Sequence, residues 1–416
     1  MKLGLLHLYA AGHLNPSLAL AAGLVERGVE VVDFNILDNA LAIERAGARF
    51  VPFGEGVMGL GYLADVARMT ATLSGEASLR YFGQRMTLLE LTAFNELPSL
   101  IKNEAVDALI IDQLFPGGST VAEHLGLRFI TVANALLINE EDGVPPPSLP
   151  WVYDSSDAAR ERNRLGWDGT RKIFQPLLDL TNKQRVTWNL APHNDFLQDA
   201  QSPLLQLAQI PAAFDFPRKQ SPLNLHYVGP LRHERARQRI SFPWDRLTPQ
   251  PLIYASLGTL QNGISQIFQA ILEAAEGLDA QIVLTLGGAQ RNSSHTHVPA
   301  NVLVVDYAPQ EELLDRAALC VTHAGINTVI DCLSRGIPMV TIPIASEQPG
   351  NAARVVWTKT GTMVPLDQLT SERLRGAMQS VLGDDSYRKN ARRFAEEIAS
   401  SDSVAVATEL IANALS

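Results

Sequence analysis

The sequence is poor in cysteine, with only Cys320 and Cys332 among its 416 residues. Two cysteines give no disulfide framework, and nothing near them has the spacing of metal ligands, so we expect a cytoplasmic protein in which both are small core residues. No stretch of about 18 residues is free of charged or strongly polar side chains, and no transmembrane helix is therefore expected.

Basic residues are also in deficit, since 34 Lys and Arg face 44 Asp and Glu and leave a net charge of -10. This balance argues against nucleic acid or an anionic membrane surface as the main partner, but it does not exclude an apolar ligand. Hydrophobic residues make up 46% and charged residues 19%, which is typical of a globular protein. The length suits two domains of about 200 residues each.

The N-terminus, MKLGLLHLYAAG, has one lysine, an apolar run and small residues, as a signal peptide has. The run is short, however, and a turn and an amphipathic helix follow it. We therefore interpret this segment as a first strand entering a helix, with His7 as a structural residue of that strand.

Short apolar runs alternate with helical patterns through the first half of the chain. Buried strands are expected at residues 3–9, 29–36, 106–115 and 127–136. Such alternation predicts a parallel sheet covered by helices on both faces. Residues 55–100 and 143–205 interrupt the alternation, and insertions of this kind after strand ends commonly build ligand pockets.

The second half repeats this scheme. Strands are expected at residues 251–260, 281–288, 301–310, 318–325 and 337–344. The charged segment 232–250 carries two prolines and no apolar periodicity, so it reads as an interdomain linker. The predicted fold is α/β, with two doubly wound, Rossmann-like domains facing a central cleft. The expected domains are 1–231 and 251–384, followed by a C-terminal helix over 385–416 that packs back towards the first domain.

Polar residues gather where three strands of the second half end: Ser256 to Thr259, Tyr307 to Gln310, and His323 to Thr328. The third junction opens a helix, whose free N–H groups and positive dipole end form an anion site. Gly325 permits close backbone approach, and His323 and Thr328 add donors. Taken one at a time, each of these residues is explained by a structural role, as a helix cap or a core residue, as well as by ligand binding. Together they indicate a nucleotide or phosphate ligand.

The stretch YAPQEELLDRAALCVTHAGINTVIDCLSRGIPMVTIPIASEQPGNAARV (307–355) resembles the donor-binding signature of the family 1 glycosyltransferases, which have the GT-B fold. The SLGT segment at 256–259 resembles a phosphate-contacting loop of the same family. Residues 106–136, 152–162 and 214–231 resemble the bacterial zeaxanthin glucosyltransferases. The resemblance covers most of the chain and is weakest over residues 30–100.

The resemblance assigns a donor site to the second half. Tyr307 takes the place of a base-stacking tryptophan, Asp331 that of the ribose-binding carboxylate, and Glu347 with Gln348 that of a pair that binds the sugar hydroxyls. Tyrosine for tryptophan, and glutamate for the commoner aspartate at 347, are departures from the family pattern. The full set of implied donor-binding residues is Ser256, Thr259, Tyr307, Ala308, Gln310, His323, Gly325, Asn327, Thr328, Asp331, Glu347 and Gln348.

The resemblance also assigns the catalytic residues. His13 stands in the Gly-His-x-x-Pro turn that holds the family's base, and Asp112 stands where an aspartate orients that histidine. A neutral imidazole can take the proton of an attacking hydroxyl, and a carboxylate behind the ring fixes its tautomer. The alternative is that both residues cap local structure. No metal and no cofactor are expected, since the co-substrate is a nucleotide sugar such as UDP-glucose and the chain has no Asp-x-Asp pair.

The resemblance therefore predicts an inverting transfer of a hexose to a hydroxyl of a lipophilic acceptor, such as a hydroxylated carotenoid. Alternatives are a flavonoid, macrolide or other phenolic acceptor, a catalytically silent sugar-nucleotide or lipid binding protein, and a sugar-nucleotide epimerase. A carotenoid acceptor would favour a peripheral membrane contact through residues 55–100. The sequence does not indicate an oligomeric state.

Overall fold

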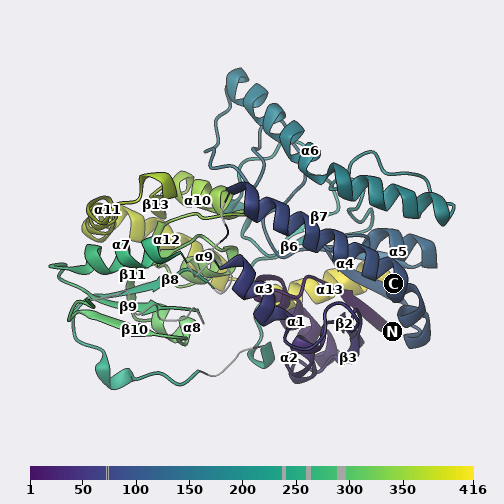
Figure 1. Cartoon of the computed structure of the whole chain (residues 1–416), viewed down its shortest axis with the longest axis horizontal. Helices are drawn as coiled ribbons and strands as arrows, with labels where there is room; N and C mark the ends of the chain where they lie inside the picture. Colours follow the sequence, from purple (N-terminus) through teal and green to yellow (C-terminus); the bar gives the residue numbers. More distant parts are fainter. Residues whose placement is uncertain (72, 74, 237–239, 259–263, 288–296) are drawn as a thin grey trace.

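The computed structural model describes residues 1–416 except 72, 74, 237–239, 259–263 and 288–296, so the predicted donor residue Thr259 lies outside the described part. It contains two parallel sheets, which lie in separate halves of the molecule (Figure 1). We call the half built on the seven-stranded sheet the first domain and the half built on the six-stranded sheet the second domain. The predicted α/β fold with two parallel sheets is confirmed.

The first sheet has the strand order β3-β2-β1-β4-β5-β6-β7. Its strands are β1 (Lys2–Leu6), β2 (Glu30–Asn35), β3 (Arg49–Pro52), β4 (Ala108–Asp112), β5 (Arg128–Ala133), β6 (Gln206–Ala208) and β7 (Leu225–Tyr227). The order reverses between β1 and β4, and ligands of doubly wound sheets bind at the carboxyl ends of the strands beside such a reversal.

Six helices accompany this sheet in the described residues: α1 (Ala11–Glu26), α2 (Ala40–Arg45), α3 (Tyr62–Thr70), α4 (Gly75–Glu104), α5 (Gly118–Leu125) and α6 (Asp157–Thr187). The long helices α4 and α6 belong to the two insertions recognised in the sequence, and they pack against each other. Figure 1 shows α6 projecting along the upper edge of the molecule. No helix in the described ranges combines the length and apolar character that a membrane crossing needs.

The second sheet has the order β10-β9-β8-β11-β12-β13 and reverses between β8 and β11. Its strands are β8 (Leu252–Ser256), β9 (Gln281–Thr285), β10 (Val302–Val305), β11 (Ala317–Thr322), β12 (Met339–Thr341) and β13 (Gly361–Met363). Its helices are α7 (Ser265–Ala275), α8 (Gln310–Leu314), α9 (Ile326–Ser334), α10 (Gln348–Trp357) and α11 (Ser371–Gly383).

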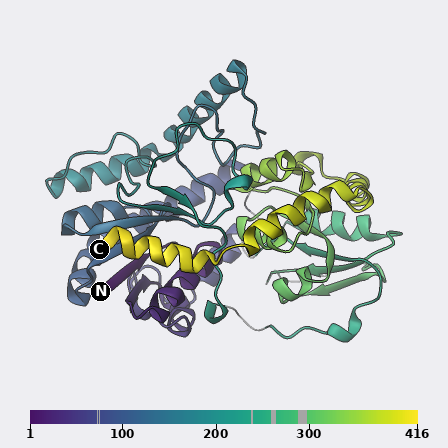
Figure 2. The same cartoon turned by 180° about the vertical axis from the view of Figure 1, so that it is seen from behind.

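The C-terminal segment forms two helices, α12 (Asp385–Ala399) and α13 (Ser403–Leu415), where the sequence predicts one. The break lies at the Ser-Ser-Asp sequence before α13, where the Asp402 side chain accepts the N–H of Ala405 and caps the new helix. Helix α12 packs on α9 of the second domain, whereas α13 packs on α1 of the first (Figure 2). Gly23 of α1 allows this approach, because a Cβ there would lie 2.2 Å from Val404 Cγ1.

A continuous apolar core joins the two domains. It includes Leu136 and Phe214 from the first domain and Val329 and Phe394 from the second. The rings of Phe214 and Phe394 meet edge to face, with centroids 6.3 Å apart. The domain boundary is therefore packed like a domain interior.

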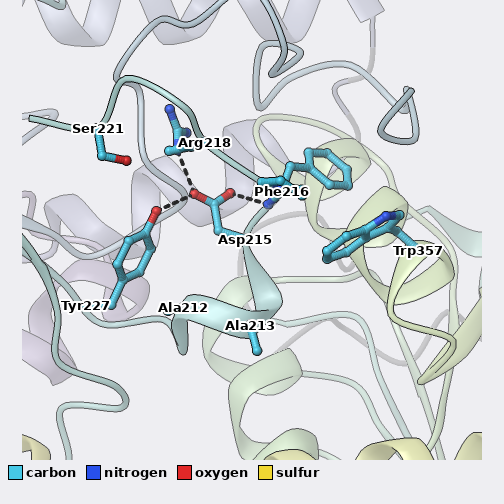
Figure 3. Close-up of a pocket in the computed structure, with 9 residues that line it drawn as sticks. Ala212, Ala213, Asp215, Phe216, Arg218, Ser221, Tyr227 and Trp357 are labelled. Atoms are coloured by element: carbon cyan, nitrogen blue, oxygen red, sulfur yellow. Dashed lines mark hydrogen bonds and ion pairs between the residues drawn. The ribbon is translucent and has the colours of Figure 1, made fainter. Parts of the chain in front are cut away.

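A buried ion pair lies at the same boundary. Asp215 of the first domain accepts bonds from Arg354 Nη2 at 2.7 Å and Nε at 3.0 Å, across the interface. Its second oxygen accepts from Arg218 Nε and the Tyr227 hydroxyl, both at 2.8 Å (Figure 3). Burial by itself would raise the pKa of Asp215, but the two guanidinium groups outweigh it and hold the pKa of this carboxyl below its usual range. A cavity of about 320 Å³ lies beside the cluster.

Helix α4 carries an unusual buried carboxyl, Glu90, in its contact with α6. Glu90 is inaccessible to solvent, and its Oε1 accepts the hydroxyl of Thr181. Among the described residues its Oε2 has no hydrogen-bond partner. Burial raises the pKa of Glu90 to about 8. The group is therefore protonated in the folded protein at neutral pH and carries a charge in the unfolded chain.

We predict that Glu90→Gln is more stable than the wild type at neutral and alkaline pH. Because the folded pKa is raised, the wild type loses stability as pH rises from the ordinary carboxyl value to about 8, by up to about 1.4 kcal/mol per pH unit. Glutamine does not titrate, so the difference in the free energy of unfolding between Glu90→Gln and the wild type should grow over this pH range and then level off. Denaturant unfolding at several pH values checks this, with the exposed Glu55→Gln as control. A difference independent of pH would contradict the prediction.

Candidate active site

His13 and Asp112 meet at the carboxyl end of the first sheet, as the family resemblance implies. His13 lies in the first turn of α1, and Asp112 is the last residue of β4. The His13 Nδ1 and Asp112 Oδ2 atoms are 2.6 Å apart. This contact places the ring proton on Nδ1 and leaves Nε2 as the nitrogen that can accept a proton.

Asn134 and Ser17 complete this arrangement, and sequence reasoning missed both. Asn134 directly follows β5, and its Nδ2 donates to Asp112 Oδ2 at 2.9 Å and to Ser17 Oγ at 3.0 Å. The Ser17 hydroxyl donates to the backbone oxygen of His13 at 2.8 Å. A polar residue following the neighbouring parallel strand was the available signal. Three residues of the first domain, Asp112, Asn134 and Ser17, therefore fix the orientation of the imidazole.

The charges around His13 favour its protonated form. Burial by itself would lower the pKa of His13, but the carboxylates of Asp112 and Glu347 outweigh it and raise that pKa above its ordinary value. Burial by itself would raise the pKa of Asp112, but His13 and the donors from Leu114 and Asn134 hold it below its usual range. Asp112 therefore stays ionised while His13 gains and loses a proton. Glu347 is supplied by the second domain, so the two domains act on one imidazole.

His323 lies at the carboxyl end of β11, between two glycines. A Cβ on Gly258 would lie 2.8 Å from the His323 Cε1 atom, and a Cβ on Gly325 would lie 2.6 Å from its Nε2 atom. Burial lowers the pKa of His323 to about 4, so the ring is neutral and donates a single N–H. The turn that follows His323 is strained, because Ala324 has a φ of 67°.

Helix α9 begins at this turn, with Gly325 as its N-cap residue. Thr328 lies in the first turn, and its hydroxyl donates to Gln310 Oε1 at 3.4 Å. Ser256, at the end of the adjacent strand β8, accepts the N–H of Gly258 at 3.4 Å. Serine, threonine and histidine side chains are thus gathered at a helix N-terminus, which is the arrangement that an anion requires.

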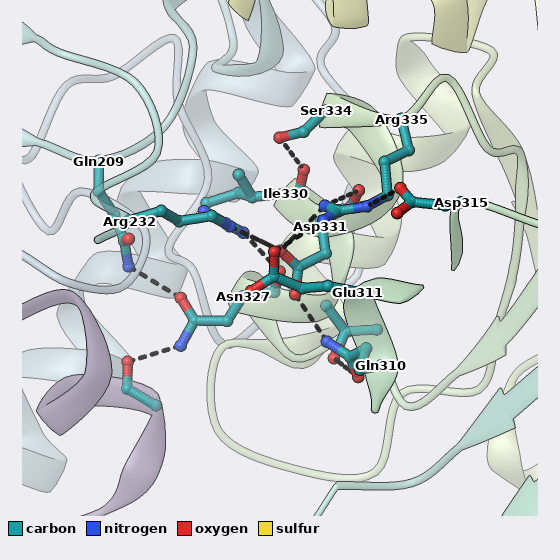
Figure 4. A network of polar contacts seen from close by, with 12 residues as sticks. Gln209, Arg232, Gln310, Glu311, Asp315, Asn327, Ile330, Asp331, Ser334 and Arg335 are labelled. Carbon is teal, nitrogen blue, oxygen red and sulfur yellow. Dashed lines mark hydrogen bonds and ion pairs between the residues drawn. The ribbon is translucent and has the colours of Figure 1, made fainter. Parts of the chain in front are cut away.

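Asp331 is more heavily engaged than the sequence suggests. Its Oδ1 accepts Arg232 Nε at 2.7 Å, and its Oδ2 accepts Gln310 Nε2 at 2.7 Å (Figure 4). Arg335 adds an ion pair at 3.7 Å. Arg232 was assigned to the linker on the strength of its charged neighbours, and nothing in that run distinguishes it. A ligand hydroxyl that binds Asp331 therefore shares this carboxylate with protein donors.

Asn327 was predicted as a donor-binding residue, but its side chain is hydrogen-bonded to the first domain. Its Nδ2 donates to the backbone oxygen of Gly12 at 2.8 Å, and its Oδ1 accepts Gln209 Nε2 at 3.1 Å. The N-termini of α1 and α9 therefore lie opposite each other across the domain boundary. Gln209 is a further residue that sequence reasoning missed.

The remaining predicted residues lie around the same end of the second sheet. Tyr307 is 53% exposed and Ala308 is buried, so the ring stands free to cover a planar ligand. The Gln348 Oε1 atom accepts the N–H groups of Ile344 and Ala345, at 2.8 and 2.9 Å, and shapes the loop before α10. Within the described ranges no three His, Cys, Asp or Glu side chains are grouped to hold a metal ion.

We predict that Gly325→Ala weakens the binding of a nucleoside diphosphate by about tenfold or more, because the new methyl group overlaps the His323 ring. The backbone itself accepts alanine, since the φ of Gly325 is -61°. Titration calorimetry measures the affinity. Gly376→Ala, where a Cβ meets nothing within 4 Å, is the control and should bind as the wild type does. Equal affinity in both variants would refute this account of the turn.

Comparisons with known proteins agree with this geometry. The erythromycin biosynthesis protein CIII-like C-terminal domain matches residues 269–413. Zeaxanthin glucosyltransferase of Pantoea ananas is 33% identical over 388 residues, which cover 92% of this chain and 88% of that protein. The 4'-demethylrebeccamycin synthase of Lentzea aerocolonigenes is 27% identical over 411 residues, 96% of each chain.

The fold has close counterparts among solved structures. The glycosyltransferase of kitacinnamycin superposes with a TM-score of 0.78 at 21% identity and covers 100% of this chain and 99% of its own. The similarity to zeaxanthin glucosyltransferase extends over most of the length of both proteins. This chain belongs to the family 1 glycosyltransferases and has their GT-B fold.

Proposed function

We propose that this glycosyltransferase moves a hexose, glucose from UDP-glucose, to a hydroxyl group of a hydroxylated carotenoid such as zeaxanthin, with inversion at the anomeric carbon. The contact of 2.6 Å between His13 and Asp112 carries the catalytic part of the proposal. The 33% identity to a zeaxanthin glucosyltransferase supports the acceptor.

In this mechanism the acceptor hydroxyl oxygen attacks the anomeric carbon from the side opposite the diphosphate. The bond between that carbon and the diphosphate oxygen breaks, and the hydroxyl proton passes to His13 Nε2. Asp112 keeps the ring in the required tautomer and stabilises the imidazolium, as the low pKa of its carboxyl allows. The resulting imidazolium returns its proton to solvent after the products leave.

The leaving nucleoside diphosphate gains negative charge as the bond breaks. The N–H groups at the start of α9, the Thr328 hydroxyl and the neutral His323 ring supply donors for that charge. No step in this scheme requires a metal ion or a resident cofactor. Tyr307 stacks on the base, and Glu347 with Gln348 faces the sugar.

The first domain offers apolar surface for a lipophilic acceptor. Val57, Leu60 and Met69 are exposed, Leu60 by 80%, in the insertion that follows β3. These exposed side chains also support a peripheral contact with a lipid surface, from which a carotenoid would be taken. The relative named 4'-demethylrebeccamycin synthase is not named for a carotenoid, and this favours testing a second candidate acceptor class: a flavonoid, macrolide or other phenolic natural product.

We predict that His13→Ala lowers kcat by about 10²- to 10⁴-fold while the affinity for UDP stays within a few-fold, because only the base is lost. The wild-type kcat should also fall as the pH is lowered, because His13 must be neutral to act as the base. Since the pKa of His13 is raised, the midpoint of this fall should lie above the ordinary pKa of histidine. Steady-state rates across pH measure both effects. His226→Ala removes an exposed histidine of the same domain and serves as control. Full turnover by His13→Ala would exclude it as the base.

A cross-screen identifies the substrates. The enzyme is incubated with each pair of one donor (UDP-glucose, dTDP-glucose or UDP-galactose) and one acceptor (zeaxanthin, a flavonoid or a macrolide). The products are identified by mass spectrometry. We expect transfer of one or more glucosyl units from UDP-glucose to zeaxanthin. If the flavonoid or the macrolide is glucosylated and zeaxanthin is not, the carotenoid assignment is wrong and the second acceptor class takes its place.

A further inference from the structure

Gln209 touches both halves of the active site. It directly follows β6 in the first domain and is 1% exposed. Its Nε2 donates to Asn327 Oδ1 at 3.1 Å, in the first turn of the second domain's α9. The same nitrogen donates to the backbone oxygen of Asn134. An amide nitrogen has two hydrogens, so each domain receives one.

Both partners of Gln209 are themselves bonded to the catalytic elements. The Asn134 side chain donates to Asp112 Oδ2, the oxygen that contacts His13. Asn327 donates to the backbone oxygen of Gly12, next to His13 in the chain. Figure 4 shows Asn327 held between Gln209 and α1. A hydrogen-bonded path thus runs from the turn that opens α9 to the imidazole on the other side of the boundary.

We propose that Gln209 is a positioning residue that sets the distance between the base and the donor-site turn. The inference rests on the proposed function for the role of His13. Transfer requires the acceptor oxygen, held by a base in one domain, to lie in line with an anomeric carbon held by the other. A misplacement of about 1 Å can lower a rate by about 100-fold. Gln209 does not touch the reacting atoms and acts through Asn134 and Asn327.

Gln206, the first residue of β6, provides a matched control three residues before Gln209. It is also a buried glutamine, 7% exposed, and it is hydrogen-bonded at both ends. Its Nε2 donates to the backbone oxygen of Ser202 at 3.3 Å, and its Oε1 accepts Asn139 Nδ2 at 2.9 Å. Both partners lie in the first domain. Gln206→Leu therefore loses comparable buried bonds, both of which are made within the first domain.

The test compares Gln209→Leu, Gln209→Glu and Gln206→Leu in the full-length enzyme, by kcat, UDP affinity and Tm. We expect kcat of Gln209→Leu to fall by about 10- to 100-fold with UDP affinity within about threefold. The kcat of Gln209→Glu should fall at least as far. A carboxylate cannot donate a hydrogen bond to the backbone oxygen of Asn134 or to Asn327 Oδ1, and both oxygens repel it. Gln206→Leu should lower Tm by a similar amount and keep kcat within about twofold. Either Gln209 variant suffices if the other does not fold.

Three results would overturn the inference: wild-type kcat in a folded Gln209 variant, an equal fall of kcat in Gln206→Leu, or a loss confined to UDP affinity. The rates are measured with whichever acceptor the cross-screen identifies, so a wrong acceptor does not affect the test. If His13→Ala keeps full turnover, the proposed function fails. If His13→Ala is inactive and Gln209→Leu is normal, only the inference about Gln209 fails.

Discussion

The buried pair of Asp215 and Arg354 is the constraint on which the assembled site depends. Removing two charges from water is costly, and the cost is offset only because Arg218, the Tyr227 hydroxyl and the Phe216 ring complete the cluster. The pair therefore tolerates little change in geometry, and the apolar core around Phe214 and Phe394 packs the same boundary. The proposed mechanism takes its reacting groups from two domains, so it needs such a fixed boundary.

With the boundary fixed, two strand-end sites become one. His13 and Asp112 lie at the reversal in the first sheet, and His323 and Ser256 lie at the reversal in the second. The division of labour follows from the local electrostatics. Paired carboxylates make the first histidine basic, whereas burial without a carboxylate keeps the second neutral. In the proposed mechanism the same side chain thus serves as a proton acceptor in one domain and as a neutral donor in the other.

The sequence predicts the sheets and the two insertions, because each depends on a local pattern: an apolar run, a turn and the start of a helix. The pairing of His13 with Asp112 is implied by the family resemblance, since no local pattern joins two residues so far apart in the chain. The sequence does not predict Asn134, Gln209 or Arg232. These residues act through partners far away in the chain, and their surroundings in the sequence resemble ordinary loops. His7 shows that residue type alone does not identify the catalytic histidine. It contacts Asp33 at 2.9 Å, much as His13 contacts Asp112, but it lies within the buried strand region and not in an open turn. The break before α13 depends on a single cap, Asp402, within an otherwise helical pattern.

The return of α13 to the first domain has a mechanical consequence. The chain passes between the domains twice, once after β7 and once between α12 and α13. Two covalent connections define a line through the boundary. Rotation about that line leaves both connections intact, whereas twisting or sliding in other directions strains at least one of them. The two covalent connections thus add to the packed core and the buried ion pair, and together they hold His13 in a constant position relative to the second domain.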